Sequence, residues 1–149
     1  MSDVKMLING EAVGADQTFD VINPATEHVI TECPLATEAH LDQAVNAANE
    51  ALLSWSARTI DERRAIILQI ADRIEDNIGE LAQQLSEEQG KPIEGFAGLG
   101  AMFELGGCLA WIRYTASLDL PVEVIQDNDD ARIEVHRKPV GVVGSITPW

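Results

Sequence analysis

The sequence is poor in cysteine, and this shortage limits where the protein works. Only Cys33 and Cys108 occur among its 149 residues, too few for the disulfide framework of a small secreted domain. The stretch MSDVKMLING also has neither the basic segment nor the apolar segment of a secretory signal. We therefore expect a cytoplasmic protein.

Basic side chains are scarce as well. The chain has 10 Lys and Arg residues against 25 Asp and Glu residues, a formal net charge of −15. Nucleic-acid binding draws its affinity from Lys and Arg side chains that neutralise phosphates, and anionic lipid attracts the same side chains. We therefore expect no nucleic acid and no membrane surface as a partner.

One long apolar run occurs, from Gly95 to Ile112. It is shorter than the ~20 residues that a membrane-spanning helix needs, and it carries Glu104 and five glycines. We predict a helix buried in protein, and no span.

Short strands are predicted before Pro34. Asn9-Gly10 lies between two apolar runs and is typical of a tight hairpin turn. Two more runs end at Asn23-Pro24 and at Pro34, where proline cannot extend a strand ladder.

Helical periodicity follows. Thr37 is predicted to cap a first helix with Glu38 in its first turn, and Thr59-Ile-Asp-Glu matches a capping box for a second helix that ends at Gly90. A third helix, about Ile93 to Leu118, is apolar nearly all round, so we expect it to be covered on both sides.

The last third returns to strand patterns. Apolar and polar residues alternate on both sides of QDNDDA, which predicts an antiparallel ribbon with one solvent-exposed face. VGVVGSI lacks this alternation, which is typical of a central strand covered on both faces. Strands that are covered on both faces are typical of α/β proteins, so we expect an α/β fold.

The sequence offers no catalytic or metal site of its own. Neither cysteine has a nearby His or Lys in sequence to lower its thiol pKa, so both are expected to be inert packing residues, Cys108 within the buried helix. The spacing of His28, Cys33 and His40 matches no metal-ligand pattern, and His136 is expected to be solvated.

Several motifs in order carry a family resemblance. INGEAV, FDVINPAT, EEQGKP, IRYTASL and EVHRKPVGVVGSITPW, from about Leu7 to Trp149, resemble the N-terminal part of the NAD(P)-dependent aldehyde dehydrogenases. The resemblance implies that residues 1–121 are the first part of a Rossmann-like NAD(P)-binding domain. It also implies that residues 122–139 are a β-ribbon of the oligomerisation domain, and residues 140–149 the first strand of the dinucleotide-binding sheet.

The resemblance also implies a site. The main chain of Ile146 and Thr147 and the pair Pro148-Trp149 would line the nicotinamide-ribose side of NAD or NADP. The asparagine, cysteine and glutamate that do the chemistry in the family would lie beyond residue 149.

We therefore expect an N-terminal fragment that is inactive alone, from a parent that oxidises an aldehyde. A homo-oligomer would form through the ribbon or through exposed apolar surface. The alternative is a stand-alone, catalytically dead assembly or binding module.

Overall fold

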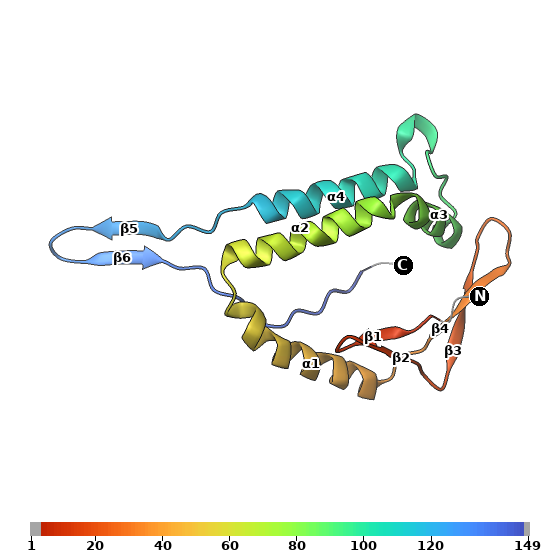
Figure 1. Ribbon diagram of the computed structural model, residues 1–149, viewed down its shortest axis with the longest axis horizontal. Coiled ribbons are helices and arrows are strands. Elements are labelled where there is room, and N and C mark those ends of the chain that lie inside the picture. Colours follow the sequence, from red (N-terminus) through yellow and green to blue (C-terminus); the bar gives the residue numbers. More distant parts are fainter. Residues whose placement is uncertain (1–3, 148–149) are drawn as a thin grey trace.

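The computed structural model describes residues 4–147, which form helices and three two-stranded antiparallel sheets (Figure 1). The strands are β1 (Met6–Ile8), β2 (Glu11–Val13), β3 (Thr18–Ile22), β4 (Val29–Pro34), β5 (Glu123–Asp127) and β6 (Arg132–Val135). The helices are α1 (Glu38–Ser56), α2 (Ile60–Asp76), α3 (Ile78–Gln89), the 3-10 turn η1 (Phe96–Gly98) and α4 (Ala101–Ser117).

The predicted hairpin at Asn9-Gly10 and the predicted ribbon are confirmed. β1 pairs with β2 across Asn9-Gly10, where both residues have positive φ, 53° and 78°. β5 pairs with β6, and the Asn128 side chain accepts hydrogen bonds from the backbone N–H groups of Asp130 and Ala131 in the connecting turn. An Asn side chain that closes a turn in this way replaces backbone partners that the ladder cannot supply.

Both predicted helix starts are confirmed. The Thr59 hydroxyl accepts a hydrogen bond from the Glu62 N–H at 3.2 Å, and the Glu62 carboxylate accepts one from the Thr59 N–H at 2.7 Å. At α1 the reciprocal partner is His40, whose Nδ1 accepts from the Thr37 N–H at 3.1 Å. A histidine thus takes the position that Glu or Gln occupies in the usual capping box.

The predicted second helix is divided into two. α2 stops at Asp76, Asn77 leaves helical geometry with φ −113° and ψ 13°, and α3 begins at Ile78. The Asn77 side chain donates to the Arg73 carbonyl at 2.8 Å, which satisfies an end carbonyl of α2. The amphipathic stripe continues across this break, so hydrophobic periodicity alone did not reveal it.

The predicted third helix begins eight residues late, at Ala101 instead of Ile93. Gly95 adopts φ 65° and ψ 173°, a conformation open to glycine and closed to an α-helix. Gly100 lies against the preceding loop, where an added Cβ would come within 2.4 Å of the Pro92 carbonyl oxygen. The loop is held to the first turn of α4 by hydrogen bonds from the Ala101 and Met102 N–H groups to the Pro92 and Ile93 carbonyls.

α2 and α4 run side by side, with α3 packed on the beginning of α4 (Figure 1). Small side chains allow these helices to approach closely. The buried residues of the described chain are Ala71 on α2, Ala82 on α3, and Ala101, Leu109 and Ala116 on α4. Arg113 on α4 also pairs with Glu75 and Asp72 on α2, and the hydrogen bond to Glu75 raises the pKa of the guanidinium.

The expectation that α4 is covered on both sides is wrong for this chain. Phe103, Trp111 and Tyr114 are exposed, Trp111 at 69%, and Cys108 is exposed as well. α2 and α3 make the main helix contacts with α4. Trp111 and Tyr114 contact each other edge to face, with ring centroids 5.7 Å apart.

The expected strand over 140–149 is also absent from its described part, residues 140–147. These residues are irregular, and Val140 is 91% exposed. Figure 1 shows the stretch running back from the ribbon between α1 and α2 without a neighbouring strand. A strand exists only where a partner completes its hydrogen-bond ladder, and residues 4–147 provide none here.

The chain leaves much of its surface in water. A compact globular protein of 16.2 kDa exposes about 7,500 Å², whereas this chain exposes 11527 Å². Exposed large apolar side chains occur on α1, α4, the ribbon and residues 140–147, among other elements. Patches of this kind mark surfaces that contact other protein.

Candidate functional site

The predicted cofactor-binding residues fall at the end of the irregular stretch. Ile146 is 100% exposed, so no described residue covers it, and Thr147 is exposed as well. Pro148 and Trp149 lie outside the described residues. The segment therefore presents its backbone groups and its apolar side chains, Val140, Val142, Val143 and Ile146, to solvent.

The β5–β6 ribbon carries a row of charges on one strand. Arg132 donates to Glu134 at 2.7 Å and to Asp127 across the strands at 2.7 Å, and His136 Nε2 lies 2.9 Å from the Glu134 carboxylate. The hydrogen bond from Arg132, followed by the one from His136, lowers the pKa of Glu134. His136 is exposed, as predicted, and it is bonded to Glu134.

The same ribbon exposes apolar side chains. These are Val124, Ile125, Ile133 and Val135. The ribbon projects beyond the helices, and its strands contact each other (Figure 1). A two-stranded ribbon with uncovered apolar residues is marginally stable alone and is suited to packing against another surface.

An open groove of about 610 Å³ runs along α2 and α3. It is lined by Ile66, Gln69, Ile70, Arg73, Ile74, Asn77, Glu80, Leu81 and Gln84. Isoleucines at positions 66, 70 and 74 recur at helical spacing, so the groove follows the side of α2 that α4 leaves uncovered.

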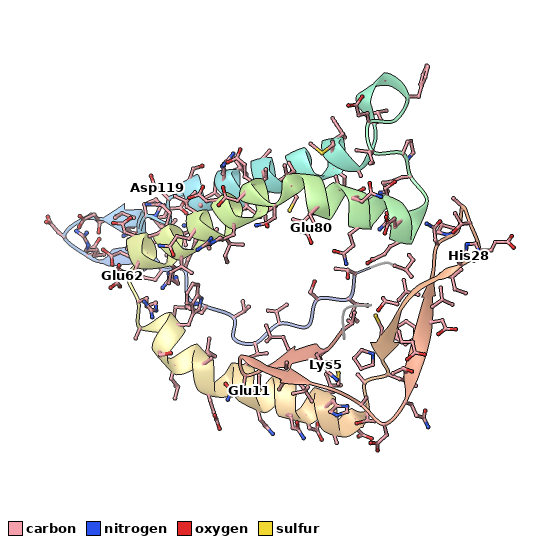
Figure 2. All side chains as sticks on the ribbon, turned by 45° about the vertical axis from the view of Figure 1, so that its right-hand side comes forward. Lys5, Glu11, His28, Glu62, Glu80 and Asp119 are labelled. Carbon is pink, nitrogen blue, oxygen red and sulfur yellow. The ribbon has the colours of Figure 1, made fainter. Side chains whose placement is uncertain are left out.

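The candidate nucleophiles and ligands are dispersed. Cys33 is half-buried on β4, whereas Cys108 is exposed on α4, which corrects its predicted burial. His28 lies near the tip of the β3–β4 hairpin (Figure 2), and His40 takes part in the α1 cap. Within residues 4–147, no three His, Cys, Asp or Glu side chains are grouped so as to hold a metal ion.

None of the helices in the described part of the chain is both long enough and apolar enough to cross a bilayer.

Sequence reasoning missed two arginines that organise the base of the ribbon. Arg64 on α2 donates to the Leu118 carbonyl at 3.2 Å and to Asp119 at 3.1 Å, and Arg137 donates to the Pro121 carbonyl at 3.3 Å. The Arg64 contacts join residues more than 50 positions apart in sequence, and the Arg137 contact joins residues 16 positions apart. No local pattern in the sequence could have indicated them.

Comparison with known proteins gives a consistent result. The profile of the aldehyde dehydrogenase family matches residues 12–149. Glutarate-semialdehyde dehydrogenase of Pseudomonas putida is 34% identical over 144 residues, covering 95% of this chain and 30% of the relative. Aldehyde dehydrogenase LUC3 of a Fusarium species is 33% identical over 143 residues, covering 96% of this chain and 30% of the relative.

Solved structures agree with these matches. Succinate-semialdehyde dehydrogenase from Burkholderia pseudomallei has a TM-score of 0.82 at 31% identity, covering 92% of this chain and 28% of that one. PnpE in complex with nicotinamide adenine dinucleotide has a TM-score of 0.82 at 34% identity, covering 93% and 28%.

The matched region is the N-terminal portion of these enzymes, and the chain spans about 30% of the length of the curated relatives. The fold is that of the corresponding part of the solved structures. The chain belongs to the aldehyde dehydrogenase family.

Proposed function

We propose that this chain serves as the N-terminal part of an NAD(P)-dependent aldehyde dehydrogenase. The parent converts an aldehyde, NAD(P)⁺ and water to a carboxylic acid and NAD(P)H. The observation that carries the proposal is the family match over residues 12–149, which is nearly the whole chain. The uncovered faces of α1, α4 and residues 140–147 support it, because they have the apolar character of surfaces that pack inside a larger fold.

Residues 4–147 alone do not fit a dinucleotide. Ile146 is fully exposed, so this part of the chain forms no walls around it. Ligand sites bury most of their ligand between walls on several sides. We therefore propose that Ile146, Thr147, Pro148 and Trp149 line the cofactor only when further protein covers them, and that the isolated chain binds NAD(P) weakly.

The chain alone is also proposed to be inactive. Oxidation of an aldehyde by this route needs a thiolate beside a base and a donor for the oxyanion. Cys33 and Cys108 lie on separate elements, and neither hydrogen-bonds to a His in the described residues. The groups that would supply these roles are proposed to come from the parent beyond this portion.

The test is an assay of aldehyde-dependent NADH or NADPH formation on the purified 149-residue chain, with short aliphatic and semialdehyde substrates. We expect no rate above a no-protein blank. Turnover that scales with protein concentration and is lost in Cys33→Ser or in Cys108→Ser would contradict the inactivity proposal.

A second test concerns the gene. Coding sequence that continues in frame past codon 149, beginning with an asparagine codon, supports the parent enzyme. A stop codon there supports the alternative.

That alternative is an assembly module without catalysis, and the exposed apolar residues of the ribbon favour it. Either role predicts self-association, because exposed strand edges and apolar residues promote pairing between copies. Light scattering should show a mass above the monomer for the chain and a lower mass for Ile133→Thr. Val140→Thr, on the irregular stretch, tests whether that segment contributes instead.

We also propose the cytoplasm as the compartment. Two cysteines that form no disulfide are typical of proteins in a reducing environment.

A further inference from the structure

The end of α4 lacks a cation of its own. The last carbonyls of any helix have no partner within it, and they carry the negative end of the helix dipole. α4 ends at Ser117 with no basic residue in its last turn. A cation from outside the helix would therefore be stabilising at this end.

Arg64, on the first turns of α2, supplies that cation. Its Nε donates to the Ala116 carbonyl, and its Nη2 donates to the Leu118 carbonyl at 3.2 Å and to the Asp119 carboxylate at 3.1 Å. Its Nη1 donates to Asp61 at 2.6 Å, which orients the guanidinium from its own helix. The side chain is 25% exposed. Figure 2 shows Asp119 at the end of α4 and Glu62 at the start of α2, on the same side of the helical pair.

These contacts fall where the ribbon begins. Among residues 4–147, Arg64 makes the side-chain hydrogen bonds that join residues 118–119 to α2, and the Leu118 N–H donates to the Thr115 carbonyl of α4. Arg132 and Arg137, in contrast, bond within residues 118–139. Arg137 on the returning chain donates to the Pro121 carbonyl of the outgoing chain, which holds the two together. The direction of the ribbon is thus transmitted from Arg64 through 118–121 to both strands.

We propose that Arg64 is a positioning residue that sets the direction in which the β5–β6 ribbon leaves the helices. Its planar fork binds the carbonyls at 116 and 118 and the side chain at 119 at once, which fixes several successive peptide groups. A lysine has the same charge and no fork, so it cannot hold this set in one geometry. The ribbon strands do not pack on the helices (Figure 1), so this clamp takes the place of packing.

The consequence for assembly rests on the proposed function, in which the ribbon pairs between copies. A ribbon held in one direction presents Ile133 and Val135 in one orientation to a second chain. A ribbon that swings would pair in several orientations, which lowers the effective concentration of the productive one.

The test measures the direction of the ribbon in the intact chain. In a Cys33→Ser, Cys108→Ser background, spin labels are placed at Asp129→Cys on the ribbon tip and at Gln69→Cys on α2, both exposed positions. Labelled chain is diluted with unlabelled chain so that pulsed electron resonance reports distances within one molecule. We expect one narrow distribution, which Arg64→Met broadens by roughly twofold because the junction then samples several states.

Arg63→Met is the matched control. Arg63 neighbours Arg64, carries the same charge and donates to the Arg58 carbonyl just before its own helix. The Arg63→Met variant should leave the distance distribution narrow. Arg64→Lys should retain the helical content in circular dichroism and still broaden the distribution, which separates the fork from the charge and from any folding defect.

Three outcomes would overturn the proposal: an unchanged distribution in Arg64→Met, equal broadening in Arg63→Met, or a narrow distribution in Arg64→Lys. The ribbon-pairing proposal is judged apart from this, by light scattering. If Arg64→Met broadens the distance distribution and leaves the mass of the assembly unchanged, the Arg64 proposal stands and pairing through the ribbon is rejected. If Arg64→Met keeps the distribution narrow and lowers the mass, the Arg64 proposal is rejected and pairing through the ribbon stands.

Discussion

The α2–α3–α4 helices and the stretch from the ribbon to residue 147 differ in what holds them. The helices share buried alanines, Leu109 and ion pairs that connect α2 to α4. The ribbon has only its own ladder and a base held by arginines, and residues 140–147 have neither ladder nor core. Local sequence signals thus form helices or strands in both regions, but burial stabilises only the helical region.

The largest effect should be seen in hydrogen exchange. Amides of α2 and α4 should exchange more slowly than those of 140–147 by on the order of 100-fold or more, because the helices open only with their core. Exchange followed by mass spectrometry on peptides from both regions measures this ratio. Equal protection would show that residues 140–147 are covered in solution, contrary to the exposure seen here.

Leu109→Ala should have the second-largest effect, a loss of stability. Leu109 is the one buried side chain larger than alanine among the described residues, so its removal leaves a cavity between α4 and its neighbours and costs about 2–5 kcal/mol of unfolding free energy. Urea unfolding monitored by circular dichroism measures the loss. Leu53→Ala is the control, an exposed leucine on α1. A similar loss in both variants would mean that α4 is no better packed than α1.

Thr59→Ala should cost about 1 kcal/mol, because the Glu62 N–H loses the hydroxyl that accepts its hydrogen bond and the Glu62 carboxylate loses the hydrogen bond from that hydroxyl. The same urea titration applies. Thr115→Ala, an exposed helical threonine on α4, should be close to neutral. A loss at Thr115 as large as that at Thr59 would contradict the importance of the cap.

The smallest effect is a dependence on pH at this cap. The hydrogen bond from the Thr59 backbone, then that from its hydroxyl, lowers the pKa of Glu62 below its ordinary value of 4.5. A carboxyl group with a depressed folded-state pKa stabilises the fold above its unfolded pKa, and this contribution is lost as pH falls through the folded-state value. Helix content should therefore decline on acidification below pH 4.5 by less in Glu62→Gln than in the parent. Identical titration curves for the two proteins would show that Glu62 does not contribute to the pH dependence of helix content.

Local signals in the sequence predicted the elements that local chemistry determines. Asn9-Gly10, Thr37 and Thr59 each form the turn or cap expected of them, because the partners lie within four residues. The family resemblance, carried by motifs along the whole chain, is confirmed by the profile match and the solved structures.

Predictions that depended on distant partners did less well. The break at Asn77 and the late start of α4 arise from a side-chain cap and from the fit of Gly100 against Pro92, neither of which alters the apolar periodicity. Burial of α4 and of residues 140–147 was inferred from composition, and composition indicates what a surface can contact without showing that a partner is present. The Arg64 clamp joins residues more than 50 apart, beyond the range of any local pattern.

The large exposed area has a consequence for chemical denaturation. The denaturant slope m grows with the surface that unfolding newly exposes. With 11527 Å² already in contact with water, unfolding this chain exposes only about three-quarters of the area expected for a compact protein of its mass. Its unfolding curve in urea should accordingly be shallow even where its midpoint is ordinary, and addition of protein that covers these faces should steepen it.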